Sequence, residues 1–132
     1  MSNMLKTHNI LNNNILKIHN ICFKENKGIE YFKGLNIKKI YEYENIAYCI
    51  LIDSIDIYEI FEIAVLPEFR NKGIASKLLE ILEKDKDIFL EVNEVNHSAI
   101  NLYKKNGFKE ISRRKAYYVN KDAIIMKKDK VN

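Results

Sequence analysis

The chain has 132 residues, of which 47% are hydrophobic and 30% are charged, with a formal net charge of +4 at pH 7. This length predicts one domain over residues 1–132, and the balance of apolar and charged residues is typical of a folded globular protein. Only three of the 22 basic residues are Arg and no basic stripe is interleaved with aromatic residues, which argues against nucleic-acid recognition.

The cysteines and histidines give no sign of a metal or disulfide framework. Cys22 and Cys49 are far apart and form no C-x-x-C pair, which favours a reduced intracellular protein, and the three histidines form no cluster. No apolar run approaches a membrane-spanning length, and residues 1–10 lack the apolar core and cleavage site of a signal peptide. We therefore expect a cytoplasmic protein with no metal and no membrane partner.

The first half of the chain predicts helices followed by a meander. Apolar residues recur at helical spacing from Asn12 to Lys27, with Asn12 to Asn14 as candidate caps, and a second short helix is expected over Gly28–Leu35. Three strand-like runs follow, and the turn residues between them predict antiparallel hairpins. These runs are Lys39–Tyr43, Ile46–Ile52 and Tyr58–Val65.

The second half alternates helices and strands. An amphipathic helix is predicted over Gly73–Lys84, a buried strand over Ile88–Val92, and a helix over His97–Lys105. Asn96 is the expected N-cap of this last helix, and Asn106-Gly107 its left-handed stop. The two final strands are Phe108–Val119 and Ala123–Lys128. This order mixes antiparallel and parallel pairing, which predicts the α+β class.

The turn between Val65 and Gly73 has the composition of an anion site. The first N–H groups of a helix have no intrahelical partner, and the helix dipole adds partial positive charge. Gly73 and Ala75 leave room for a ligand to approach the backbone, and Arg70 and Lys72 add full charges. Such a turn binds a phosphate or pyrophosphate. The spacing matches neither the dinucleotide nor the P-loop motif, and it fits an ordinary strand-to-helix turn equally well.

The R-x-x-G-x-A element Arg70–Ala75 closely resembles motif A of the GNAT acetyltransferases, and the stretch Leu90–Phe108 resembles their motif B. The resemblance implies a mixed, mostly antiparallel twisted sheet of six or seven strands, splayed between its central strands and flanked by about four helices. It also implies that acetyl-CoA lays its pantetheine arm along the strand end and its pyrophosphate on the loop. The implied cofactor-contacting residues are Ile63, Ala64, Val65, Arg70, Asn71, Lys72, Gly73, Ile74, Ala75, Ser76 and Asn96.

The segments Arg113–Tyr118 and Asp122–Met126 are similar to the RimI-type ribosomal-protein alanine N-acetyltransferases, a GNAT subgroup. There a strand glutamate is the general base and a tyrosine on the next helix is the general acid, which match Glu91 and Tyr103. Taken alone, Glu91 reads as a solvated strand residue and Tyr103 as a core residue. The resemblance implies direct acetyl transfer, within a ternary complex, to a protein's N-terminal α-amine. Glu59 is an alternative base, as in other GNAT branches.

The acceptor side carries less of the subgroup's pattern. The chain has no Trp where the subgroup often has Pro-Trp, and Asn93 stands where Arg is common. Tyr117 and Tyr118 are candidate acceptor contacts or simply packing residues. The alternatives for the acceptor are therefore a protein N-terminus, with a ribosomal protein as one candidate, and a small amine of the polyamine or aminoglycoside type. A non-catalytic acyl-CoA-binding module is the remaining alternative, and both a monomer and a homodimer are compatible with the sequence.

Overall fold

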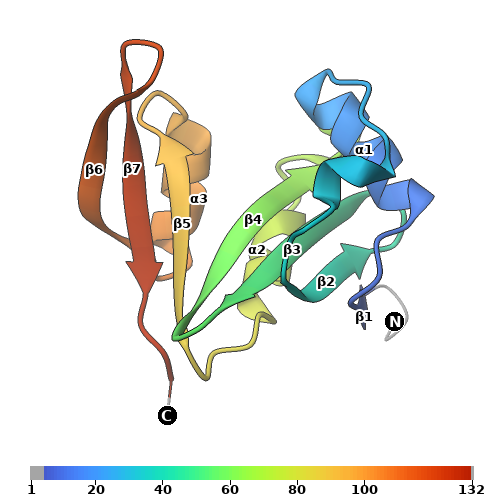
Figure 1. Ribbon diagram of the computed structural model, residues 1–132, viewed down its shortest axis with the longest axis horizontal. Helices are drawn as coiled ribbons and strands as arrows, with labels where there is room; N and C mark the ends of the chain where they lie inside the picture. Colours follow the sequence, from blue (N-terminus) through green and yellow to red (C-terminus); the bar gives the residue numbers. More distant parts are fainter. Residues whose placement is uncertain (1–4, 132) are drawn as a thin grey trace. The chain divides into compact units, whose positions relative to one another are not determined.

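A computed structural model describes residues 5–131 of the chain, whose elements are labelled in Figure 1. Seven strands follow the pairing order β1-β2-β3-β4-β5-β7-β6. The pairs β1–β2, β2–β3, β5–β7 and β7–β6 are antiparallel, and β4–β5 is parallel, which confirms the predicted α+β class. The strands are β1 (Leu5–His8), β2 (Ile37–Tyr43), β3 (Ala47–Ser54), β4 (Ile57–Val65), β5 (Asp87–Asn93), β6 (Lys109–Tyr118) and β7 (Lys121–Lys128).

All six strands that the sequence predicts are present, and their ends lie within two residues of the predicted ones. The strand β1 was not predicted from the sequence. It has four residues, of which only Leu5 is strongly apolar, and this pattern is too short and too polar to indicate a strand. It forms because its backbone pairs antiparallel with β2, from Leu5 opposite Tyr43 to His8 opposite Ile40.

Two helices have the predicted caps. Helix α1 (Asn13–Phe23) begins after Asn12, whose side chain accepts a hydrogen bond from the Ile15 N–H. Helix α3 (His97–Lys105) begins after Asn96, whose side chain accepts from the Ala99 N–H, and Gly107 follows with a φ of 94°. A short polar side chain at the start and a left-handed glycine after the end satisfy backbone groups that a helix cannot pair internally.

The other two predicted helices are shorter than expected. The segment Gly28–Leu35 holds only a single 3-10 turn, η2 (Ile29–Phe32), because Gly28 is extended and Gly34 is left-handed with a φ of 89°. Helix α2 (Ile74–Glu80) ends before the predicted Lys84. The buried Leu82 continues the apolar spacing beyond the helix end, which explains the longer prediction. A further 3-10 turn, η3 (Pro67–Phe69), precedes α2.

The chain groups into two compact units. The first comprises the residues before Ser54 together with Ile60–Leu82, and holds β1 to β3, the second part of β4, α1 and α2. The second comprises Ser54–Glu59 and the residues from Glu83 onward, with the start of β4, β5 to β7, and α3. The single domain over residues 1–132 stays a prediction.

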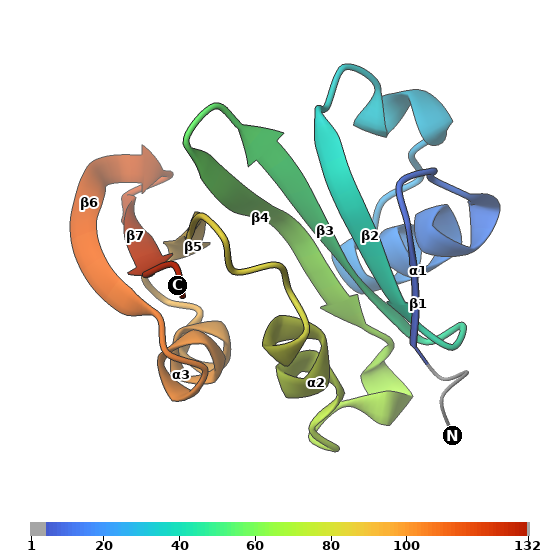
Figure 2. The ribbon, with the colours of Figure 1, turned by 90° about the horizontal axis from the view of Figure 1, so that it is seen from below.

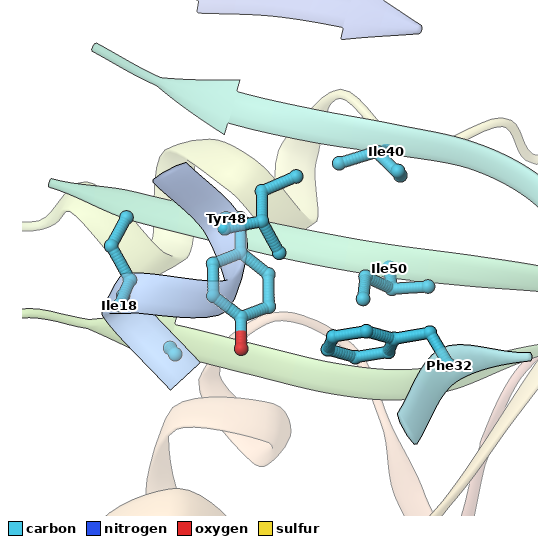
Figure 3. Packing of buried hydrophobic residues seen from close by; sticks show 7 residues of the cluster. Ile18, Phe32, Ile40, Tyr48 and Ile50 are labelled. Atoms are coloured by element: carbon cyan, nitrogen blue, oxygen red, sulfur yellow. The ribbon is translucent and has the colours of Figure 1, made fainter. Parts of the chain in front are cut away.

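Helices cover both faces of β2 and β3 in the first unit (Figure 2). On one face, Ile18 of α1 and Phe32 of η2 pack against Ile40, Tyr48 and Ile50, which project from β2 and β3 (Figure 3). On the opposite face, α2 brings the Lys77 ammonium to 5.7 Å from the centre of the Tyr43 ring. Because successive strand residues point to opposite faces, a strand covered on both sides reads as a nearly continuous apolar run, as Ala47–Leu51 does.

A buried polar network closes the α1 side of this core. The His19 side chain is 1% exposed, and its ring nitrogens lie 2.9 Å from a Glu62 carboxylate oxygen and 2.7 Å from one of Glu25. The Tyr48 hydroxyl donates to Glu62 at 2.7 Å and the Tyr31 hydroxyl donates to it at 3.2 Å. Burial and the Glu62 charge raise the pKa of Tyr48, and they raise the pKa of Tyr31 to about 12.

We predict that Tyr48→Phe lowers the free energy of unfolding by about 1–3 kcal/mol, because it removes a hydrogen-bond donor from the largely buried Glu62 carboxylate. Urea denaturation at pH 7 measures this value. Tyr31→Phe is the matched control, since it removes one hydroxyl from the same carboxylate at a longer distance and from an exposed ring, and it should cost less. Equal losses for the two variants would contradict the ranking.

Candidate functional site

In the first unit, strand β4 ends at Val65, whose carbonyl oxygen accepts two hydrogen bonds. The Arg70 Nε donates to the Val65 carbonyl at 2.9 Å, and the Cys22 thiol donates to the same oxygen at 3.4 Å. The next amide, that of Leu66, donates to the Ile46 carbonyl at 2.9 Å. These bonds hold the end of the strand at Val65, directly after Ile63 and Ala64, and set the direction in which the following loop leaves it.

The loop after β4 contains two residues with left-handed backbone. Asn71 and Gly73 have φ angles of 63° and 80°, and both lie in the left-handed region. A Cβ added to Gly73 would meet nothing within 4 Å, so the space beside its backbone is open. Arg70 and Lys72 are exposed, and no side chain caps the start of α2 at Ile74.

The chemistry of this loop fits a phosphate-bearing ligand. The backbone beside Gly73 is open, helix α2 starts next to it, and the neighbouring cations are exposed. Together these features favour the binding of an anion. Ala75 and Ser76 follow in the first turn of α2 and are half-buried. The Arg70 guanidinium already uses its Nε on the Val65 carbonyl, which orients the group rather than leaving it to move freely.

In the second unit, a cavity of about 320 Å³ lies beside β5. Parallel pairing of β4 with β5 sets Glu59 opposite Phe89, and Glu91 follows two residues later on the same face of β5. Both carboxylates line the cavity, so the two candidate bases lie at the same site. Its apolar lining includes Ile57, Phe89, Ile111 and Ile125.

The two carboxylates have different partners. The Ser54 hydroxyl donates to a Glu59 oxygen at 3.3 Å. A Glu91 oxygen lies 3.0 Å from the Arg114 Nη2, with the Glu91 side chain 33% exposed and that of Arg114 55% exposed. The sequence analysis did not identify Arg114 as a site residue. Alternation along β6, which places Ser112 and Arg114 on one face, could have indicated it, since both residues line the cavity.

The two candidate acceptor tyrosines lie near these groups. The Arg114 guanidinium lies 5.4 Å from the centre of the Tyr117 ring, and the Tyr117 and Tyr118 rings are in contact at 5.2 Å. Burial, followed by the charge of Glu91, raises the pKa of Tyr118. The structure therefore brings Glu59, Glu91, Tyr117 and Tyr118 into one region of the second unit.

An irregularity in β6 precedes these tyrosines. Ala116 has a φ of 50°, and the pairing of β6 with β7 shifts register between Arg114 and Tyr118. The Ala116 N–H donates to Asp122 at 2.9 Å, and this bond is the first cause of a lowered Asp122 pKa, with help from the charges of Lys115 and Arg113. Bulges of this kind redirect side chains at the ends of strands.

The remaining predicted residues lie on α3. Tyr103 is 7% exposed and its ring contacts Phe108 at 5.7 Å. Asn96 is exposed, caps the helix through Ala99 and also accepts from the Ser98 hydroxyl at 3.5 Å. Both lie in the second unit, whereas Ile63–Val65 and Arg70–Ser76 lie in the first.

Residues 5–131 contain no group of three or more His, Cys, Asp or Glu side chains placed to hold a metal ion. Over the same residues, no helix combines the length and the apolar character needed to cross a membrane.

Comparison with known proteins identifies the family. Residues 36–110, more than half of the chain, match the acetyltransferase (GNAT) domain. A ribosomal protein bS18-alanine N-acetyltransferase of Salmonella typhimurium is 35% identical over 114 residues, which are 79% of this chain and 75% of that protein. An N-alpha-acetyltransferase of Saccharolobus solfataricus is 43% identical over 75 residues, 51% of this chain. The match spans only 45% of that archaeal relative.

Solved structures share the fold. The ribosomal-protein-S18-alanine N-acetyltransferase of Escherichia coli superposes with a TM-score of 0.79 at 24% identity, covering 98% of this chain and 97% of that one. A GNAT family acetyltransferase from Elizabethkingia anophelis, solved with acetyl-CoA bound, gives a TM-score of 0.72 at 17% identity, covering 96% and 99%. The chain belongs to the GNAT acetyltransferase family.

We predict that Gly73→Ala lowers the free energy of unfolding by about 1 kcal/mol, because a residue with a Cβ is disfavoured at a φ of 80°. The new methyl group would meet open space, so no clash adds to this cost. Urea denaturation measures it. Lys72→Ala, which alters the neighbouring exposed residue without imposing a new backbone preference, should leave stability within about 0.5 kcal/mol of the wild type.

Proposed function

We propose that the chain is an acetyl-CoA-dependent N-acetyltransferase that acts on the N-terminal α-amine of a protein. The observation that carries this proposal is the pair Glu59 and Glu91 at one cavity, since an amine that is mostly protonated at neutral pH needs a carboxylate to take its proton. The names of the Salmonella and Saccharolobus relatives favour a protein N-terminus, with a ribosomal protein as one candidate.

The residues for the co-substrate are those of the β4 end and its loop. In this proposal, the backbone of Ile63–Val65 pairs with the pantetheine arm, and Arg70–Ser76 hold the pyrophosphate through amides and cations. Asn96 is a further contact. Acetyl-CoA supplies an acetyl thioester, whose carbonyl carbon is the electrophile. The open space beside Gly73 supports this assignment, because a side chain there would stand where the phosphate approaches.

The acid and base are assigned to the second unit. Glu91 acts as general base, directly or through a water, and Arg114 at 3.0 Å holds its carboxylate in place. Glu59 is the alternative base, because it lines the same cavity and accepts a hydrogen bond from the neutral Ser54 hydroxyl at 3.3 Å. Tyr103 acts as general acid toward the departing thiolate. The transfer is direct, from donor to amine, with no covalent enzyme intermediate.

We predict that Glu91→Gln lowers kcat by about 10²- to 10⁴-fold, because it removes the proton acceptor while keeping the size of the side chain. Steady-state release of CoA measures kcat, and calorimetry with acetyl-CoA should show nearly unchanged affinity. Glu59→Gln is the matched control, with the same chemical change at the same cavity. If Glu59→Gln gives the larger loss, Glu59 is the base. If neither variant changes turnover, the acid-base assignment is wrong.

The acceptor class is tested with a panel of amines. Peptides with free N-termini should be acetylated with kcat/KM values at least tenfold above those for polyamines and aminoglycosides. The same peptides with blocked N-termini serve as controls for acetylation of lysine side chains. Turnover of small amines alone would contradict the protein acceptor and favour a small-amine acetyltransferase. Binding of acetyl-CoA without turnover of any amine would indicate an acyl-CoA-binding module.

A further inference from the structure

The cavity beside β5 has two chemically distinct parts. Glu59, Glu91 and Arg114 provide charges, and the lining is otherwise largely apolar, with Phe89 and Ile111 as examples. The Glu91 charge is partly balanced by Arg114 at 3.0 Å, which leaves the cavity with one net negative charge. A ligand that fits both parts carries a cationic amine next to an apolar group.

The apolar part exists because of how β5 is covered. Leu90 and Val92 are buried, at 3% and 6% exposed, and alternate with Phe89 and Glu91, which point to the other face. Across from Glu91, Ile125 of β7 is its direct partner, so an apolar side chain adjoins the carboxylate. Ile111 of β6 adds a wall that is 49% exposed, so a ligand in the cavity would cover part of its apolar surface.

We propose that this cavity is a specificity subsite for the side chain of the amine-bearing residue, and that it selects a large apolar first residue such as leucine, methionine or phenylalanine over alanine. The proposal rests on the proposed function, because it places the α-amine at the carboxylates. A volume of about 320 Å³ is about ten times that of one water in the liquid, enough for such a side chain.

Selectivity follows from the area that the side chain covers. An alanine methyl at the carboxylates would leave Ile111, Ile125 and Phe89 in contact with water, whereas a leucine side chain would bury them. Differences of a few methylene groups in an apolar pocket change kcat/KM by about 10- to 200-fold. We therefore expect peptides that differ only in the first residue to rank with leucine at least tenfold above alanine.

The kinetic test compares these peptides in the wild type and in Ile111→Trp, which fills the cavity from an exposed position. The leucine-to-alanine ratio of kcat/KM should be at least tenfold in the wild type and should fall at least threefold in Ile111→Trp. Ile10→Trp, at a residue 72% exposed and outside the cavity, is the matched control and should keep the wild-type ratio. An alanine peptide that is turned over as well as the leucine peptide would overturn the subsite.

A binding test separates this inference from the proposed function, because it needs no turnover. Leucinamide and glycinamide carry the same α-ammonium group and differ only in the side chain. In methyl NMR spectra of the wild type without acetyl-CoA, leucinamide should shift the Ile111 and Ile125 methyl signals, and glycinamide should shift them less. Equal shifts, or none, would overturn the subsite even if the protein is an active acetyltransferase. Shifts without turnover of any peptide would retain the subsite and reject the proposed function.

Discussion

The site depends on the parallel pairing of β4 with β5, which runs from Ile57 opposite Asp87 to Glu59 opposite Phe89. This short ladder brings Glu59 and Glu91 to one cavity, although 31 residues separate them in the chain. A parallel pair also requires a long crossover connection. Here the crossover starts at Val65 and contains the loop Arg70–Gly73 and helix α2. One topological constraint thus accounts for both the carboxylate pair and the existence of a strand-to-helix loop.

The acidic side chains differ in how many hydrogen bonds and ion pairs they form and in how deeply they are buried. Glu62 accepts from Tyr48 and Tyr31 and lies 2.9 Å from His19, and its side chain is only 10% exposed. Such a carboxylate stabilises the core between α1, η2 and β4. Glu91 is paired with a single exposed Arg114 and is itself one-third exposed. The weaker, solvated pair leaves Glu91 available for a ligand, because exposed ion pairs contribute little to stability.

Local sequence signals predicted most of the elements correctly, for identifiable reasons. The helix His97–Lys105 has an asparagine cap and a glycine stop, so both of its ends are encoded locally. The helix predicted over Gly28–Leu35 was too long, because glycines near both ends of the segment limit it to one turn. The strand β1 escaped prediction because its pairing with β2, rather than its own composition, makes it a strand. The register shift between Arg114 and Tyr118 coincides with a hydrogen bond from the Ala116 N–H to Asp122, which no local pattern encodes.

The sequence by itself determined the family, the loop that contains Gly73, and the identity of Glu59, Glu91, Tyr103 and the two acceptor tyrosines as candidates. These depend on residue types at fixed spacing along one segment, and such spacing can be recognised without knowledge of the fold. Only the tertiary structure decided that Glu59 and Glu91 line one cavity, that Arg114 pairs with Glu91, and that Ile111 and Ile125 form its apolar wall. Those contacts join β4, β5, β6 and β7, and their proximity is set by strand order and register, which are properties of the assembled sheet.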